Sequence, residues 1–341
     1  MKAVGGKTSP TAALLAGLIR VVYSPVWLVV TIAYAVHLIW RSRKLGISAT
    51  ALSPMTMRWL QHQLGLRPDE ACAKLIKVLP NHSYAGLCVA VFPIRLGHWL
   101  TGFVPRMLRY PYEGIPPPGH SSSVRSTFVD AAVERYLPVV DQFVELGAGY
   151  DTRTVQLQRV RRLRCFEVDL PKIQQLKRGL LSRCGVDTSG ITYVPANFLI
   201  DCWLDKLVKA GFDPRKPAFF LWEGVTYYLS RQAVEGTFRT IATTAPGSVV
   251  VFDYGSDANL NRNHKPLGLL ATAFLKAVRE PQMFWISSEP PVKKNLAALL
   301  NGYGLALREH LNYGREAGRK RAFGGLAAAV LPARTPAKVK R

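Results

Sequence analysis

The chain has 341 residues, of which 48% are hydrophobic, enough for one large or two modest domains around a buried core. Its formal net charge is +23, but the basic residues are spread along the chain without a nucleic-acid-binding motif, which argues against nucleic acid as a partner. The five cysteines have no paired metal-ligand spacing, so neither a disulfide framework nor a bound metal is expected.

Residues 1–44 are predicted to be a membrane anchor. Residues 21–40 carry no formal charge, and roughly 20 apolar residues at about 1.5 Å rise match a bilayer core of about 30 Å. Arg41, Arg43 and Lys44 follow directly, and such a basic flank is typical of the cytoplasmic side. We therefore expect a membrane location with the rest of the chain facing the cytoplasm; the alternative is a buried or interfacial helix.

Residues 45–119 are predicted to form a helical region that ends in a linker. A second apolar stretch, residues 84–104, is interrupted by Pro93, Arg95 and His98, so we interpret it as a membrane-surface or core-packing segment. Residues 111–119 are rich in proline and glycine, which predicts a domain boundary there.

From residue 120 to residue 333, strand-like runs alternate with segments of helical length. The runs are residues 142–146, 163–168, 191–194, 218–222 and 248–253. This alternation predicts an α/β fold with a doubly wound, mostly parallel sheet. A final pair of runs, near residues 306–309 and 325–331, is expected to add an antiparallel hairpin, and residues 334–341 form a basic tail.

The most informative motif lies where the first predicted strand ends. Gly147 and Gly149 form a Gly-x-Gly turn, and Asp169 ends the second predicted strand about twenty residues later. In an open α/β sheet such a carboxylate binds the two hydroxyls of a ribose. Thr152 stands where a dinucleotide fingerprint has its third glycine, which favours S-adenosylmethionine, a cofactor without phosphate. The alternatives are an ordinary turn for the glycines and a helix N-cap for Asp169.

Three segments carry a resemblance to a known family. Residues 146–153, the Glu-Val-Asp-Leu-Pro block within residues 166–172, and the Glu-Gly-x-x-x-Tyr-Leu block within residues 221–229 are similar to the leucine carboxyl methyltransferase family. The resemblance covers roughly residues 120–335. It implies a class I methyltransferase, dependent on S-adenosylmethionine, with a seven-stranded methyltransferase sheet.

By this resemblance, three residues surround the methionine part of the cofactor. Arg125 would bind its carboxylate, Gly147 would border it, and Glu223 would lie beside its end. Gly149, in the same turn as Gly147, is a further cofactor-binding candidate. Glu223 also follows an otherwise apolar strand, where a carboxylate is costly unless it is paired. Without the resemblance, Arg125 is equally a solvated charge on a helix face.

The same resemblance assigns the nucleoside part. Asp169 would bind the ribose, and Asn197 with Phe198 would bind the adenine. The family usually has an aspartate at the position of Asn197. Asp151 and Arg153 beside the glycine turn rank lower, because either can simply cap the following helix.

The chemistry implied is attack of an acceptor oxygen on the sulfonium methyl group. No residue stands out as a general base, so the catalytic residue is unknown and a carboxylate acceptor, small molecule or protein, is favoured. Tyr227 and Tyr228 are candidates to line the acceptor side, and residues 255–290 are expected to cover it. Two alternatives remain open: a membrane-anchored nucleotide-dependent oxidoreductase, and a non-catalytic membrane-associated scaffold with a methyltransferase-like fold. The sequence does not give the oligomeric state.

Overall fold

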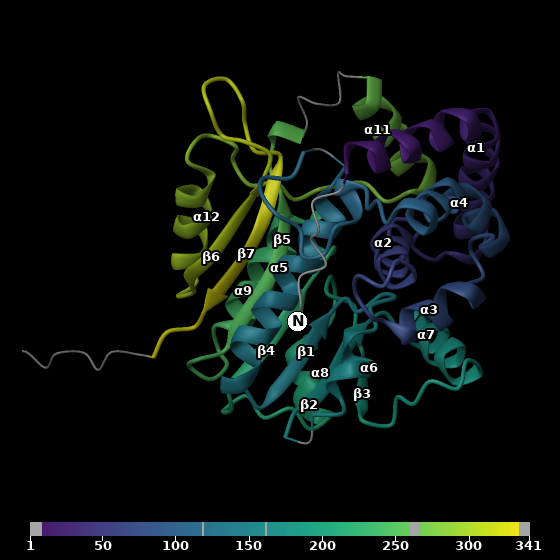
Figure 1. Ribbon diagram of the computed structural model, residues 1–341. Helices are drawn as coiled ribbons and strands as arrows, with labels where there is room; N and C mark the ends of the chain where they lie inside the picture. Colours follow the sequence, from purple (N-terminus) through teal and green to yellow (C-terminus); the bar gives the residue numbers. More distant parts are fainter. Residues whose placement is uncertain (1–8, 118, 161, 260–265, 334–341) are drawn as a thin grey trace, which may run out of the picture.

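The computed structural model describes residues 9–117, 119–160, 162–259 and 266–333 (Figure 1). The predicted basic tail, residues 334–341, lies outside the described residues, as do residues 1–8 of the predicted anchor.

A seven-stranded sheet forms the centre of the molecule, with strand order β3-β2-β1-β4-β5-β7-β6. Its strands are β1 (Gln142–Leu146), β2 (Arg164–Asp169), β3 (Ile191–Pro195), β4 (Ala218–Trp222), β5 (Val249–Gly255), β6 (Ala306–Tyr313) and β7 (Gly324–Val330). The first five are mutually parallel, and β7 runs antiparallel to both β5 and β6. The predicted strands, the parallel sheet and the closing hairpin are therefore confirmed.

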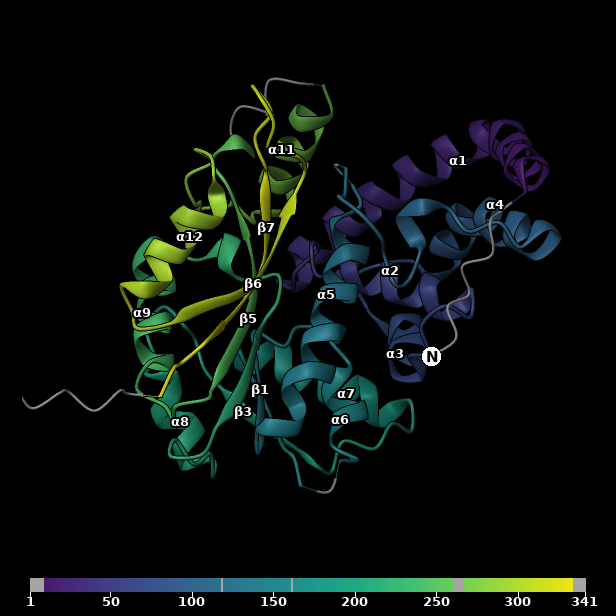
Figure 2. The ribbon, with the colours of Figure 1, turned by 60° about the vertical axis from the view of Figure 1, so that its left-hand side comes forward.

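Helices cover both faces of the sheet, as Figure 2 shows. One face carries α5 (Ser121–Tyr136), α6 (Arg153–Leu157) and α7 (Pro171–Arg183), and the other carries α8 (Trp203–Lys209), α9 (Arg231–Ile241) and α12 (Val292–Asn301). Because both faces are covered, the central strands are rich in apolar residues, and all residues of β1, β4 and β5 are buried.

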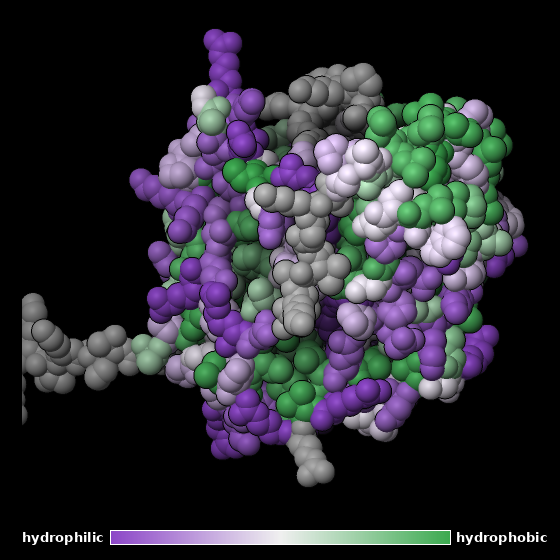
Figure 3. All heavy atoms as spheres, viewed as in Figure 1, coloured by the Kyte–Doolittle hydropathy of each residue, from purple (hydrophilic) through white to green (hydrophobic). Residues whose placement is uncertain are grey.

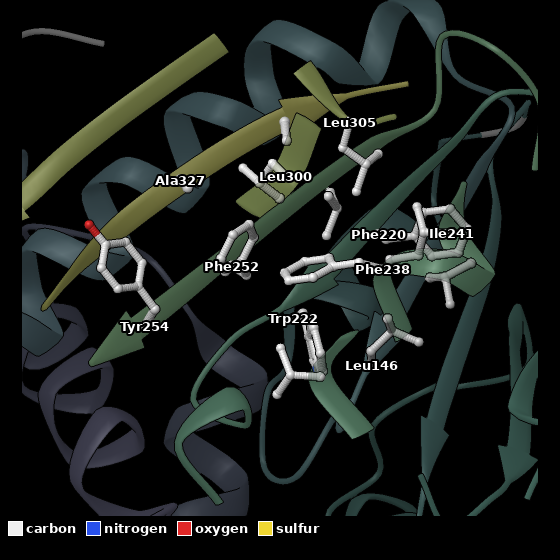
Figure 4. Close-up of a cluster of buried hydrophobic side chains, with 14 of the residues drawn as sticks. Leu146, Phe220, Trp222, Phe238, Ile241, Phe252, Tyr254, Leu300, Leu305 and Ala327 are labelled. Carbon is white, nitrogen blue, oxygen red and sulfur yellow. The ribbon is translucent and has the colours of Figure 1, made fainter. Parts of the chain in front are cut away.

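Aromatic side chains fill the core between the sheet and α9 (Figure 4). The ring of Phe238 lies 5.6 Å from that of Trp222 and 5.1 Å from that of Phe252. Trp222 is the last residue of β4, so this packing fixes the position of the chain that follows it. The core therefore holds the carboxyl ends of the central strands rigidly.

The N-terminal region is helical, as predicted, and packs beside α7. It comprises α1 (Pro10–Leu45), α2 (Leu52–Gln63), α3 (Glu70–Val78) and α4 (Tyr84–Thr101). Met55, Trp59 and Leu75 share one buried cluster with Leu180 and Leu181 of α7. The described part of the predicted insertion, residues 255–290, contains α11 (Pro266–Val278), which contacts α1.

The strand order reverses at β1, which pairs with β2 on one side and with β4 on the other. In an open α/β sheet, ligands bind outside the carboxyl ends of the strands at such a reversal. The residues that follow β1, β2, β3 and β4 therefore define the candidate site.

Candidate functional site

The glycine turn after β1 needs both of its glycines, for different reasons. Gly147 has φ +75°, and a Cβ atom there would overlap the side chain of Val225. Gly149 has φ +45°, but the nearest atom to an added Cβ is the Gly147 carbonyl oxygen at 3.9 Å. Gly147 thus allows close packing against the loop after β4, whereas Gly149 leaves space beside the turn.

Asp169 is bound to this turn through its carboxylate. Oδ2 accepts the N–H of Gly149 at 2.6 Å, and Oδ1 accepts the N–H of Leu170 at 2.6 Å. Burial raises the pKa of Asp169, and the two N–H groups oppose that shift. Each oxygen keeps a second lone pair, so the carboxylate can still accept two vicinal hydroxyls. The N-cap residue of α7 is Leu170, so Asp169 is not that helix's cap.

Arg125 and Glu223, predicted at the methionine end, lie side by side. Arg125 Nε is 2.9 Å from Glu223 Oε1, and its Nη1 donates to Asp253 Oδ2 at 2.7 Å. The Arg125 side chain is 12% exposed, so the alternative of a solvated helix-face charge is wrong. Asp253 also accepts the N–H of Gly224, which fixes the loop that carries Glu223.

Arg153 connects this pair to a larger buried ion network. Its Nη1 lies 2.6 Å from Glu223 Oε2, its Nε lies 2.8 Å from Asp130 Oδ1, and it also contacts the Asp151 carboxylate. Arg58 of α2 lies 2.6 Å from Asp151 Oδ2. Asp151 accepts the N–H of Arg153, as a cap would. The guanidinium of Arg153, which ranked lower as a site candidate, lies at the centre of the network.

The network extends into the N-terminal helical region. Arg67 pairs with Asp130 at 2.6 Å and with Asp69 at 3.1 Å, and Thr152, at the position of the missing third glycine, donates to Asp69 at 2.9 Å. Burial alone would raise the pKa of Asp130, but the charges of Arg153 and Arg67 outweigh it and lower the pKa to about 2.

Sequence reasoning missed Arg58, Arg67, Asp69, Asp130 and Asp253 as site residues. No local motif marks them, since they lie on α2, the α2–α3 connection, α5 and β5, which are far apart in the sequence. Arg153 could have been found, because it directly continues the glycine motif.

Two buried guanidinium groups at the predicted methionine end keep donor capacity. Among the residues that the structure describes, Arg125 Nε–H and Arg153 Nη2 have no hydrogen-bond partner, although both are buried. Arg125 Nε is within ion-pair distance of Glu223 without hydrogen-bond geometry. Unsatisfied buried donors are costly, and a ligand carboxylate would satisfy them. The donor set therefore fits the carboxylate of an amino acid.

Asn197 and Phe198 follow β3, the neighbour of β2. The last residue of β3, Pro195, pairs with Asp169, which places the predicted adenine residues next to the predicted ribose carboxylate. Asn197 Oδ1 accepts the N–H of Leu199 at 3.0 Å, and the ring of half-buried Phe198 packs edge-on against that of Trp203 at 6.3 Å.

The loop after β4 is covered by the described end of the insertion. The N–H of Met283 donates to the Tyr227 carbonyl at 2.7 Å, and a Cβ atom at Gly255 would lie only 2.6 Å from the Trp285 ring. From the other side, Tyr228 donates its hydroxyl to Thr50 at 3.0 Å. Burial raises the pKa of both tyrosines, so neither hydroxyl is a base near neutral pH.

Two cavities, of about 590 Å³ and 350 Å³, lie away from this site. The first is between the ends of α2 and α4, and the second lies between the α1–α2 connection and α7. The site is therefore defined by converging side chains and by the strand reversal, not by either cavity.

The strand order, the glycine turn and the acidic end of β2 together define a methyltransferase-like α/β fold. Residues 116–242 match the model of the leucine carboxyl methyltransferase family, which confirms the predicted resemblance over this part of the chain.

Relatives with curated names agree with this assignment. A Saccharopolyspora erythraea protein, provisionally named an S-adenosyl-L-methionine-dependent methyltransferase, is 39% identical over 120 residues, which are 35% of this chain and 42% of that protein. A Mycobacteroides abscessus protein with the same provisional name is 32% identical over 175 residues, 48% of this chain and 56% of that protein. The chain thus spans about half the length of these relatives.

Solved structures also resemble the chain, at low identity. One is a DUF574 family protein from Streptomyces avermitilis, with a TM-score of 0.43 and 16% identity, covering 62% of this chain and 84% of that chain. Another is magnesium protoporphyrin IX methyltransferase from Synechocystis with bound SAH, with a TM-score of 0.39 and 11% identity, covering 62% and 83%.

Proposed function

We propose that the protein is an S-adenosylmethionine-dependent methyltransferase that methylates a carboxylate oxygen. The observation that carries the proposal is the carboxylate of Asp169, held by the glycine turn at a strand reversal with acceptor capacity left for two hydroxyls. The family match and the relatives' names, which include this cofactor, support it.

The chain's own residues are assigned roles around the cofactor. Asp169 accepts the ribose hydroxyls, and Asn197 with Phe198 borders the adenine. Arg125 binds the methionine carboxylate, assisted by the free donor of Arg153, and Glu223 accepts hydrogen bonds from the amino group. When bound, S-adenosylmethionine supplies an electrophilic methyl group on its sulfonium sulfur. The protein then contributes mainly orientation and exclusion of water.

The groups on the acceptor side favour a carboxylate as nucleophile. Among the described residues there, the hydroxyls of Tyr227, Tyr228 and Tyr313 have a pKa raised by burial, so they do not remove a proton near neutral pH. A hydroxyl acceptor would need such a base, whereas a carboxylate is already ionised. A carboxylate, on a small molecule or a protein C-terminus, therefore fits best.

We further propose the domain organisation expected from the sequence. Residues 120–333 form the methyltransferase domain, residues 45–119 a helical region that supplies Arg58 and Arg67 to the site, and residues 1–44 the membrane anchor. By length and composition, α1 is the one helix of the described chain that could cross a membrane. The basic end of α1, at Arg43 and Lys44, supports attachment to the anionic, cytoplasm-facing surface of a membrane.

Isothermal titration calorimetry with S-adenosylmethionine tests the cofactor assignment. We expect saturable heat with the full chain, at least a hundredfold weaker affinity in Asp169→Asn, and unchanged affinity in Asp187→Asn, which alters an exposed aspartate before β3. Absence of binding by the unsubstituted chain would overturn the proposal, and binding of a nicotinamide dinucleotide instead would favour the oxidoreductase.

A labelled-methyl assay with a panel of carboxylic acids tests the acceptor class. Methyl esters release volatile methanol in mild alkali, whereas methyl ethers and methylamines do not. We expect alkali-labile label; cofactor binding with only alkali-stable product would retain the methyltransferase and reject the carboxylate.

A further inference from the structure

Helix α1 has two opposite apolar faces, only one of which is covered by protein. Its inner face packs along α4: Ala16 lies against Gly97, Tyr23 donates its hydroxyl to the Val89 carbonyl, and the Tyr34 hydroxyl lies 3.3 Å from His82 Nδ1. At 100° per residue, the opposite side is a continuous stripe, which we call the α1 outer face. It consists of Leu14, Leu18, Val22, Val29, Ile32, Val36 and Trp40.

The α1 outer face is exposed along its whole length. The exposed fraction of its residues runs from 56% at Trp40 to 77% at Leu14. Exposed Phe92, Trp99 and Leu100 of α4 and Leu269 and Leu270 of α11 belong to the helices that contact α1. Figure 3 shows hydrophobic residues gathered over α1 and α4. A contiguous apolar surface of this kind marks an interaction site.

The excess of basic residues in the N-terminal region favours an anionic partner for the α1 outer face. Residues 1–112 contain thirteen lysines and arginines, but Asp69 and Glu70 are their only acidic residues. Asp69 is buried in the ion network, while Arg43, Lys44, Arg95, Arg106 and Arg109 are exposed. An apolar face with Arg43 and Lys44 at its C-terminal end and Arg95 on the adjoining helix is complementary to an anionic lipid surface, whereas two copies of this chain would bring like charges together.

The contacts of α1 determine how it meets the membrane. Its C-terminal end is tied to the α3–α4 connection, because Arg41 donates to the Pro80 carbonyl at 3.0 Å and Asn81 donates to Ser42 at 3.1 Å. α4 is itself anchored on the α2 and α3 helices through buried Leu87 and Val91. Both helices are therefore held on the body of the protein.

A crossing orientation is also opposed by charges in the helix pair. Arg20 lies 5.5 Å from the Phe103 ring, and exposed Arg95 lies on the adjoining helix. Crossing as a pair would carry both guanidinium groups into hydrocarbon, where a charged side chain is strongly disfavoured. We propose that α1 lies in the plane of an anionic membrane surface, with the α1 outer face in the lipid interface and its α4 contacts intact. This inference goes beyond methyl transfer and does not depend on it.

Vesicle co-sedimentation of the purified full chain tests binding. We expect binding to vesicles of phosphatidylcholine with phosphatidylglycerol, much weaker binding to phosphatidylcholine alone, and at least tenfold weaker binding for Val29→Glu. The matched control is Val139→Glu, an exposed valine before β1 that should change nothing. No vesicle binding, together with a dimer that Val29→Glu dissociates, would show that a second copy covers this face and overturn the proposal.

Spin-label depth measurements test the orientation. Exposed or half-exposed Cys88, Cys184 and Cys202 are replaced by serine, while buried Cys72 and Cys165 remain. Labels are then placed at Leu18→Cys, Val29→Cys and Val36→Cys. A helix in the membrane plane gives equal shallow depths at all three positions. A crossing helix gives depths that differ by about 16 Å between the first two, because eleven residues separate them, and that result would overturn the in-plane orientation.

Discussion

The carboxyl-end site and the α1 outer face depart in opposite directions from the usual distribution of side chains. At the site, the four guanidinium groups of Arg58, Arg67, Arg125 and Arg153 are buried with their carboxylate partners. On α1, large apolar side chains are exposed. Both arrangements cost free energy unless a partner compensates. The site therefore compensates its charges largely within the protein, whereas the exposed apolar face of α1 calls for a partner outside it.

Arg153→Met should produce the largest loss of stability, because it leaves Asp130, Asp151 and Glu223 without their shared counter-charge. Breaking a buried pair in this way costs about 3–5 kcal/mol. Urea denaturation measures it. Two control variants should each change the free energy of unfolding by no more than about 0.5 kcal/mol. They are Arg215→Met, which removes an exposed pair with Asp213, and Val36→Glu on the α1 outer face. Equal losses of unfolding free energy in the three variants would show that the buried ion network does not contribute more to stability than these exposed residues.

Gly147→Ala should come next, because the added Cβ combines positive φ with overlap of Val225. The two effects together cost about 2–5 kcal/mol of folding free energy. Val225→Ala in the same chain should recover part of the loss. Gly149→Ala has open space and should cost only about 1–2 kcal/mol, while it weakens S-adenosylmethionine binding. A larger stability loss at Gly149 than at Gly147 would contradict these packing roles.

Acid should weaken the network through Asp130. Its pKa in the folded protein is about 2, below the unfolded value near 3.9, so its contribution to stability is present above pH 4 and is lost as the pH falls through 2. The contribution amounts to about 2.5 kcal/mol. Urea denaturation between pH 5 and pH 2 should show this loss, and Asp130→Asn should flatten the curve. An unchanged pH dependence in that variant would exclude Asp130 as the titrating group.

Asn197→Asp should have the smallest effect, and a favourable one, on cofactor binding. A carboxylate can still accept the Leu199 N–H, and a charged acceptor strengthens a hydrogen bond by about 1 kcal/mol, or roughly fivefold in affinity. Calorimetry with S-adenosylmethionine measures this change. Weaker binding would mean that the amide N–H, rather than the oxygen, faces the adenine.

The sheet could be predicted from sequence because each central strand is a short apolar run that ends in a glycine, acid or proline. Gly149 and Asp169 were predictable for the same reason: each lies at the end of a strand, where chain order determines position. Arg125 and Glu223 required the family resemblance.

The rest of the site could not be predicted because it depends on tertiary packing. Arg58 and Arg67 reach the site only because α2 packs against α5 and α3 packs against α7. Similarly, the composition of α1 shows that it is apolar all round, but only the contact with α4 reveals which face remains exposed.

Soaking a crystal with S-adenosylhomocysteine is the decisive experiment for the cofactor site. We expect both ribose hydroxyls within hydrogen-bond distance of the Asp169 carboxylate and the amino-acid carboxylate on Arg125. An unchanged Arg125–Glu223 pair, with the nucleoside absent or bound elsewhere, would show that these residues do not bind the cofactor.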